Sequence, residues 1–174
     1  ERPQAPPAIP LLSHRPLSDA CRQLAPLIPE GYVLRGLGSE PGDREALLTH
    51  WLSLGIEGLR TRFFFLPTEA VLARRASTMD FDNPRFAGIF APDGTLACLA
   101  EWAHESESEN EAEAAFSTAP GYRRKGFARI AAAACALDAR SEGVEILRID
   151  TLSENFAAKA LAQSLGGAKK LGVP

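Results

Sequence analysis

A helix made almost entirely of alanine, with a cationic turn before it, constrains the fold of this chain more than any other feature. The stretch GYRRKGFARIAAAACAL occupies residues 121–137 and follows a strand-like segment, AEAAFST, at 112–118. The distance between packed elements depends on the side chains at the contact, so a helix this thin can lie close to a sheet. Its apolar stripe comprises Phe127, Ile130, Ala134 and Leu137. The pattern predicts a strand, a loop and a helix whose first turn is held against the sheet.

The rest of the chain predicts an α/β (α+β) fold with a mixed sheet. Further strands are expected at 32–37, 85–90, 96–102 and 145–152, and helices near 17–24, 42–55, 67–77 and 153–165. We expect Gly55 to close the second of these helices, and Val71 and Leu72 to lie on the inner face of the third. The segment APDGT supplies the Asp and Gly of a hairpin turn between two strands. Because strand–helix–strand order follows the hairpin, at least one parallel crossover is expected.

Composition and charge narrow the class of protein. The chain has 174 residues and a hydrophobic fraction of 45%, which suits one domain, expected at 31–174 after a proline-rich arm at 1–30. Its net charge of −3 argues against nucleic acid and against an anionic membrane as partners. The sequence has no apolar run long enough to span a bilayer, and its first residues lack the apolar core of a signal peptide.

The cysteines, Cys21, Cys98 and Cys135, point to a reducing compartment. They are odd in number, lie far apart and match no metal-ligand spacing. The histidines, at positions 14, 50 and 104, follow no metal pattern either. We therefore expect reduced thiols, a cytoplasmic protein and no bound metal, with Cys135 a small buried residue of the alanine helix.

The loop before the alanine helix has the physical properties of an anion site. A helix N-terminus offers unpaired backbone N–H groups and about half a positive charge. Gly126 allows the backbone to approach a ligand closely, and Arg123, Arg124, Lys125 and Arg129 add cations. This arrangement favours a phosphate-bearing ligand, and the alternative is a solvated basic loop. The phosphate-binding motifs G-x-x-x-x-G-K-[ST] and G-x-G-x-x-G are both absent from the sequence.

Arg123, Gly126 and Ala128 resemble the [QR]-x-x-G-x-[GA] signature of the GNAT acetyltransferase superfamily. The strand before this signature, and EILRIDTLSEN and AAKALAQSLGG after it, extend the resemblance over roughly residues 32–170. It implies the GNAT fold: a mixed, mostly antiparallel sheet with a splayed central strand pair and flanking helices. The stretch LRTRFFFLPTEAVLARRASTMDFDNPRFAGIF, and the step of ten residues from Glu113 to Arg123, look like the bacterial protein-lysine acetyltransferase (Pat-like) branch.

The same resemblance implies where acetyl-CoA would bind. The backbone at 116–118 would pair with the pantetheine arm like an added strand, and the main chain at 124–129 would wrap the pyrophosphate. The cations would set the local field and reach toward the 3′-phosphate, and Asn155 would contact the pantetheine side. The implied cofactor-binding residues are Phe116, Ser117, Thr118, Arg123, Arg124, Lys125, Gly126, Phe127, Ala128, Arg129 and Asn155.

Acetyl transfer to an amine needs a base, because a lysine-type ammonium has a pKa near ~10.4. Glu113 is the best candidate, since it shares a strand face with the small residues Ala115 and Ser117. The Pat-like resemblance gives its strand glutamate the same role. Glu101 on the neighbouring strand is the runner-up, and the alternative for Glu113 is a solvated strand-end glutamate. Ala162 stands where many family members have a general-acid tyrosine.

Alternating acidic residues lead into the strand that carries Glu113. The segment ESESENEAE, at 105–113, has a glutamate at every second position. Such a segment can attract a basic substrate, for example a lysine tail or a polyamine, and its alternative is a solvated hairpin loop.

Two functions of different classes remain open at this stage. The first is an enzyme that moves an acetyl group from acetyl-CoA to a primary amine, on a protein lysine or a small molecule. The second is a GNAT module that binds acyl-CoA for regulation or docking without catalysis, which the missing tyrosine keeps open. The expected partners are acetyl-CoA and an amine substrate, with no nucleic acid and no membrane, and a homodimer is compatible with the sequence.

Overall fold

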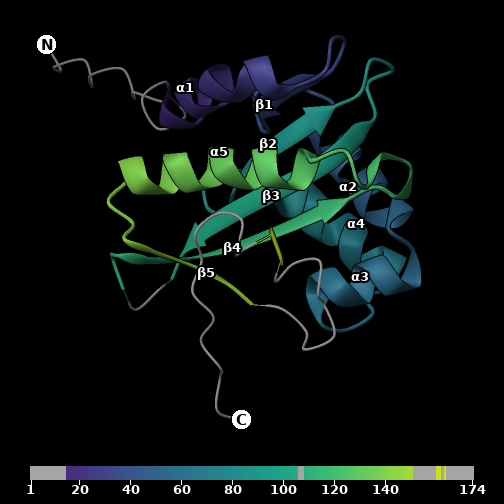
Figure 1. The fold of residues 1–174 in the computed structure, drawn as a ribbon. Helices are drawn as coiled ribbons and strands as arrows, with labels where there is room; N and C mark the ends of the chain where they lie inside the picture. Colours follow the sequence, from purple (N-terminus) through teal and green to yellow (C-terminus); the bar gives the residue numbers. More distant parts are fainter. Residues whose placement is uncertain (1–14, 106–107, 151–159, 162, 164–174) are drawn as a thin grey trace, which may run out of the picture.

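The computed structural model describes residues 15–105 and 108–150, together with 160, 161 and 163. Its centre is a five-stranded sheet with the strands in chain order, as Figure 1 shows. The strands are β1 (Val33–Gly36), β2 (Arg85–Phe90), β3 (Leu96–His104), β4 (Glu111–Thr118) and β5 (Ile146–Ile149). The pairs from β1 to β4 are antiparallel, whereas β4 and β5 run parallel. The mixed, mostly antiparallel sheet that the sequence predicts is therefore confirmed.

Helices cover both faces of this sheet (Figure 1). On one face lie α1 (Arg15–Leu24) and the alanine helix, α5 (Phe127–Ser141), which pack against each other. On the other face lie α2 (Asp43–Ser53), α3 (Gly55–Phe63) and α4 (Glu69–Thr78). Short 3₁₀ turns follow α1, at Ala25–Leu27, and β4, at Pro120–Tyr122. The parallel crossover runs from β4 through α5 to β5, as the element order predicts.

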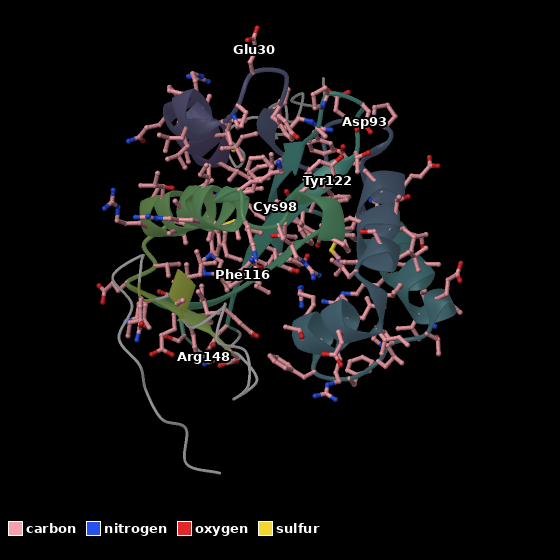
Figure 2. All side chains as sticks on the ribbon, turned by 45° about the vertical axis from the view of Figure 1, so that its right-hand side comes forward. Glu30, Asp93, Cys98, Phe116, Tyr122 and Arg148 are labelled. Carbon is pink, nitrogen blue, oxygen red and sulfur yellow. The ribbon has the colours of Figure 1, made fainter. Side chains whose placement is uncertain are left out.

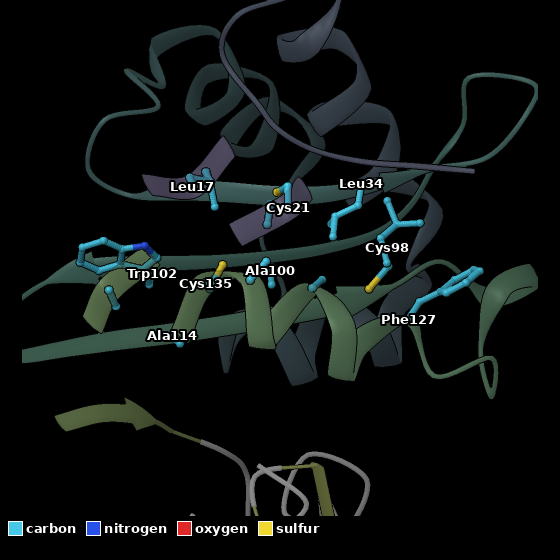
Figure 3. Packing of buried hydrophobic residues seen from close by; sticks show 14 of the residues in the cluster. Leu17, Cys21, Leu34, Cys98, Ala100, Trp102, Ala114, Phe127 and Cys135 are labelled. Carbon is cyan, nitrogen blue, oxygen red and sulfur yellow. The ribbon is translucent and has the colours of Figure 1, made fainter. Parts of the chain in front are cut away.

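The α1–α5 face is an apolar core built largely from small side chains (Figure 3). Trp102 and Phe127 stand at its ends, and alanines fill the space between α5 and the strands. All three cysteines lie in this core as free, buried thiols, which confirms the burial expected for Cys135. Burial raises the pKa of Cys98 to about 11 and that of Cys21 to about 12, so both remain thiols at neutral pH.

The α2–α4 face has a second core, made of large side chains. Trp51, Phe63 and Phe86 are buried there together with Leu47 and Leu72. Trp51 and Phe63 meet in a T-shaped contact with 5.6 Å between ring centroids, a favourable arrangement of two aromatic rings. This core holds the three helices against β2 and β3. The helix side chains that face β4 are thereby fixed in position.

Several predicted elements match the structure closely. β2 has the predicted bounds, and the hairpin after it turns at Asp93 and Gly94. The Asp93 carboxylate accepts a hydrogen bond from the Thr95 N–H at 2.9 Å, and Gly94 has a φ of 88°. The predicted strand 145–152 appears as β5 at Ile146–Ile149, and residues 151 and 152 lie outside the described residues. The helix predicted at 153–165 also lies largely outside them.

One prediction about the helices is confirmed and another is wrong. α2 ends at Ser53, and Gly55, with a φ of 71°, follows the C-cap Leu54 and closes the helix before the chain continues into α3. Val71 is not on the inner face of α4, because 50% of its surface is exposed while Leu72 is buried. Adjacent residues on a helix point about 100° apart, so only one of the two can face the sheet.

Within the described residues, no helix is both long enough and apolar enough to cross a bilayer. The same residues contain no group of three or more His, Cys, Asp or Glu side chains placed to hold a metal ion.

Candidate active site

β4 changes its pairing halfway along, and this change defines the centre of the site. Its parallel pairing with β5 ends at Ala114 and Ile149, while its pairing with β3 continues to Cys98 and Thr118. Among the described residues, the peptide groups from 115 to 118 therefore have a strand partner on one side only. Figure 1 shows the two strands separating toward this end. An unpaired strand edge can bind an extended ligand through main-chain hydrogen bonds.

The loop after β4 and the start of α5 lie next to that edge. Arg124 has a φ of 62° and Gly126 a φ of 78°, so two left-handed residues curve the loop. Turn conformations of this kind gather backbone N–H groups into an anion-binding concavity. Gly126 is the N-cap of α5, and the N–H groups of the first turn behind it have no carbonyl partner within the helix. These backbone features are compatible with an anion site, and phosphate binding at this loop stays a prediction.

The cations of this loop are exposed, as expected for groups that set a field. Arg123, Arg124, Lys125 and Arg129 all have exposed side chains, whereas Phe127 is buried in the α1–α5 core. Phe127 can therefore contribute only its backbone N–H to a ligand. A Cβ added at Gly126 would meet no described atom within 4 Å, so the backbone is unobstructed at this point.

Arg123 reaches back across the end of β4. Its Nε donates to the Thr118 carbonyl at 3.4 Å, and its guanidinium lies beside Gly58 of α3. This side chain thus joins the signature loop, the open edge of β4 and the helix that covers the strand.

The α2–α4 face of β4 carries the predicted base and its small neighbours. Glu113, Ala115 and Ser117 alternate along this face, while Ala112 and Ala114 between them are buried in the α1–α5 core. Directly opposite on β3 lie Ala103, Glu101 and Leu99. The register therefore brings both candidate bases onto one face of the sheet. In Figure 2, Phe116 is labelled on β4 and Arg148 on the neighbouring strand β5, and Phe116 packs against the α1–α5 core on the other face.

Arg62 of α3 distinguishes the two glutamates. It forms an ion pair with Glu101, whose side chain is almost fully buried, and its charge also interacts with that of Glu113. Burial lowers the pKa of Arg62 to about 10, helped by the like charge of Arg75 and opposed by Glu113, so it remains a cation at pH 7. Glu113 itself is exposed and also contributes to the negative charge around Arg148 on β5. Glu101 is thus tied to a partner, whereas the Glu113 carboxylate faces solvent.

His50 of α2 joins the site, which its sequence spacing did not indicate. It is buried, with Nδ1 2.8 Å from the Leu96 carbonyl oxygen and Nε2 2.8 Å from the Ser117 Oγ. Burial lowers its pKa to about 4. The hydrogen bond to Leu96 opposes that shift, the charge of Arg62 adds to it, and the contact with Ser117 opposes it. The ring is therefore neutral at physiological pH.

The structure brings together the predicted residues of the β4 edge and of the signature loop. Asn155, and Ala162 at the position of the missing tyrosine, lie outside the described residues. Of the acidic segment, Glu105 pairs with Arg148 at 2.5 Å, and residues 106 and 107 lie outside the description. Arg62 and His50 also face this site although no sequence motif marks them, and only their place on helices that cover β4 indicates them.

An unpaired strand edge beside a glycine-capped helix start suits a ligand that is extended at one end and anionic at the other. The profile of the Acetyltransferase (GNAT) family matches residues 57–167, and the chain belongs to this family. It is therefore an acetyl-CoA-dependent N-acetyltransferase. A search of curated proteins finds no match.

Three solved structures illustrate the similarity in fold, and two of them are named for different acceptors. The GNAT domain of S. lividans PAT is 18% identical, covers 82% of this chain and 85% of its own, and has a TM-score of 0.69. The aminoglycoside N-acetyltransferase AAC(6')-Iy, solved with CoA, is 18% identical, covers 84% and 95%, and has a TM-score of 0.62. A ribosomal-protein alanine N-acetyltransferase from Escherichia coli is 21% identical, covers 78% and 76%, and has a TM-score of 0.56. These similarities support the fold that the sequence resemblance implied.

Proposed function

We propose that this protein moves the acetyl group of acetyl-CoA to a primary amine, with Glu113 as the general base. One observation carries the proposal: an exposed carboxylate stands among small side chains on the strand whose edge opens. Glu101, the other candidate, is buried against Arg62. A base must be able to exchange its proton with substrate or water, and of the two only Glu113 has that access.

The acetyl-CoA would lie along the opening between β4 and β5. Its pantetheine arm would pair with the backbone at 116–118, and its pyrophosphate would bind the N–H groups at 124–129. Arg123, the loop cations and Asn155 complete the proposed set of contacts. A strand edge without a partner among the described residues, a left-handed loop and a helix N-terminus next to it all suit a ligand that is extended at one end and anionic at the other.

The proposed reaction is a direct attack. The amine nitrogen forms a bond to the thioester carbon, the C–S bond then breaks, and CoA leaves as a thiolate that takes up a proton from water. Because the acceptor arrives as an ammonium, its nitrogen gives up two protons. Glu113 takes the first through a water molecule before the attack and passes it to solvent, and it takes the second in the same way after the attack. Backbone N–H groups near 116–118 would stabilise the oxyanion of the tetrahedral intermediate. A thiol pKa near ~8.5 makes the thiolate a tolerable leaving group without a dedicated acid, which suits a chain with Ala162 at the tyrosine position.

A base matters because the acceptor arrives protonated. Deprotonating a lysine-type amine at pH 7 costs roughly 4–5 kcal/mol, given its pKa near ~10.4. Glu113 has Glu105 and Asp150 close by, through their shared partner Arg148, so the surrounding face is rich in carboxylates. Such a face attracts a cationic acceptor. A lysine side chain of a protein, as in the Pat-like branch, is the acceptor class that we propose first, with small amines as the second.

The test is a comparison of Glu113→Gln with wild type in a thiol-release assay on lysine peptides and small primary amines. The substitution keeps the shape and removes the base, so we expect kcat to fall by about 10²–10⁴ at pH 7 with an unchanged Kd for acetyl-CoA. The deficit should shrink as pH rises toward the pKa of the amine, because the acceptor is then already neutral.

Glu111→Gln is the matched control, because Glu111 lies on the same face of β4 but at its start. It should keep wild-type kcat. A Glu113→Gln protein that tracks wild type at pH 7 would move the role to Glu101 or to water. Acetyl-CoA binding without turnover on any amine by wild type would favour the non-catalytic binding module instead.

A further inference from the structure

The hydrogen bonds of His50 fix the position of its proton. Nδ1 faces the Leu96 carbonyl oxygen at 2.8 Å, and a carbonyl oxygen can only accept, so Nδ1 carries the hydrogen. The ring is neutral, because it is buried and Arg62 is a positive neighbour. A neutral imidazole has one N–H, and Nε2 is therefore left as an acceptor.

The proton of the Ser117 hydroxyl is fixed in turn. Its Oγ lies 2.8 Å from Nε2 of His50, and since Nε2 has no hydrogen, the hydroxyl must donate to it. In the described part of the chain, His50 is the hydrogen-bond partner of this hydroxyl. The serine side chain is half-buried and stands on the same strand face as Glu113. Because the only hydroxyl hydrogen is used in the bond to His50, the serine oxygen can act toward any other group only as an acceptor.

We propose that Ser117 is an acceptor-binding residue whose oxygen receives an N–H from the attacking primary amine, and that His50 is the positioning residue that holds it in that role. This proposal rests on the proposed transfer function. It assigns the two residues to the recognition of a nitrogen that carries two hydrogens, rather than to proton removal.

Primary amines fit this arrangement because of their hydrogen count. A neutral primary amine nitrogen has two hydrogens, one for the water of the base and one for Ser117, and both contacts turn its lone pair toward the thioester. The same two hydrogens are still on the nitrogen after the attack. Glu113 and Ser117 are four residues apart on one strand, roughly 13 Å between Cα atoms, so a water must carry the proton to the carboxylate. A secondary amine has a single hydrogen at that stage and cannot make both contacts. Ser117 therefore favours primary over secondary amines.

The alternative role, a serine nucleophile activated by histidine, does not suit this pair. A buried imidazole that stays neutral down to about pH 4 is a weak base at pH 7. A nucleophilic serine would also form an acetyl-enzyme, which a mass measurement would detect.

The experiment compares wild type, Ser117→Ala and Ser117→Thr on the best primary amine of the panel and on its N-methyl derivative. In Ser117→Ala, kcat/KM for the primary amine should fall about tenfold, the worth of one hydrogen bond to a nitrogen gaining positive charge. The value for the N-methyl derivative and the Kd for acetyl-CoA should stay within about twofold of wild type. Ser117→Thr keeps the hydroxyl and should recover most of the loss.

An equal loss on both amines, or no loss on either, would overturn the role of Ser117 while leaving the transfer function intact. A wild type without turnover would instead contradict the proposed function itself. Nitrogen-15 NMR of the wild-type His50 ring tests the tautomer without any need for turnover. A hydrogen on Nδ1 alone at pH 7 supports the proposal, and a hydrogen on Nε2 overturns it. Acetylation of Ser117 during turnover would overturn it as well.

Discussion

The two faces of the sheet differ in how accessible their polar side chains are. On the α1–α5 face, Arg85 and Asp138 are buried against each other inside an apolar core. On the α2–α4 face, Arg62 and Glu101 form a second buried ion pair and His50 is buried, but Glu113 is exposed and Ser117 is half-buried. The comparison teaches that burial of a charge does not by itself separate structure from function in this protein. What distinguishes the α2–α4 face is that accessible polar groups lie beside buried ones, next to the edge of β4.

The buried network of the α1–α5 face is well satisfied. Asp138 of α5 accepts from Arg85 Nε at 2.8 Å and from the Trp102 indole N–H at 2.8 Å, and it forms a second, shorter contact with Arg85. Glu142 adds a longer contact to Arg85, at 3.4 Å, from the rim. These bonds attach the alanine helix to β2 and β3, where alanine side chains alone would give little specificity of position.

The largest expected effect is on this network. Asp138→Ala removes the partner of a buried guanidinium and of an indole N–H, so it should lower the free energy of unfolding by about 3–5 kcal/mol. Urea denaturation measures it. Glu142→Ala is the matched control, because it removes the exposed contact to the same arginine and should cost less than about 1 kcal/mol. Equal costs for the two variants would contradict the distinction between buried and exposed partners.

The next largest effect is expected on acetyl-CoA binding at the N-terminus of α5. Gly126→Glu places a side chain and a negative charge in front of the helix N-terminus, so we expect acetyl-CoA affinity to fall more than about 100-fold. Calorimetry on the folded variant measures it.

Gly143→Glu is the control for backbone strain. Gly143 also has a left-handed φ, 89° against 78° at Gly126, and a Cβ at either position meets no atom within 4 Å. It lies just beyond the other end of α5, so its substitution should leave acetyl-CoA affinity unchanged. Wild-type affinity in folded Gly126→Glu would place the phosphate site elsewhere.

The pH dependence of the free energy of unfolding tests whether His50, on the α2–α4 face, is buried in its neutral form. Burial lowers the pKa of His50 to about 4 in the folded chain, against about 6.5 when unfolded. The unfolded state thus binds a proton first, and stability is lost as pH falls below about 6.5. The expected loss is about 1.4 kcal/mol between pH 8 and 5.5. Asp43, Asp80 and Asp93 have lowered pKa values and stay ionised in this window.

Urea denaturation at several pH values measures this dependence. His50→Gln should flatten it, because the glutamine does not titrate. A wild type whose stability is constant from pH 8 to 5.5 would show that His50 is not neutral and buried in solution.

Local patterns were enough to predict much of the fold. Strand β2, the Asp93–Gly94 turn and the glycine at the start of α5 all follow from residues close together in the sequence. Turn chemistry and hydrophobic period act over a few residues, so the sequence carries them directly. Val71 shows the limit, since two adjacent apolar residues leave the inner face of a helix ambiguous.

The site required long-range pairings that no local pattern specifies. His50 meets Ser117 at a separation of 67 residues, and Arg62 meets Glu101 at a separation of 39. Each contact depends on strand register and on how a helix packs across the sheet. A histidine that matches no motif can therefore lie at the centre of a site, whereas the glycine signature of the loop is readable because its function depends on backbone shape.

The smallest expected effect is that of Arg123, the first residue of the signature, on acetyl-CoA binding. Its side chain is exposed and makes one long hydrogen bond, at 3.4 Å, to the Thr118 carbonyl. If main-chain N–H groups hold the pyrophosphate, Arg123→Ala should weaken acetyl-CoA binding only about two- to fivefold, the worth of one exposed charge. The deficit should shrink further at high salt, where exposed charges are screened. Arg140→Ala, at the opposite end of α5, is the control and should change nothing. Calorimetry at low and high ionic strength makes the measurement. A loss approaching that of Gly126→Glu would mean that the guanidinium, rather than the backbone of the loop, is the principal phosphate ligand.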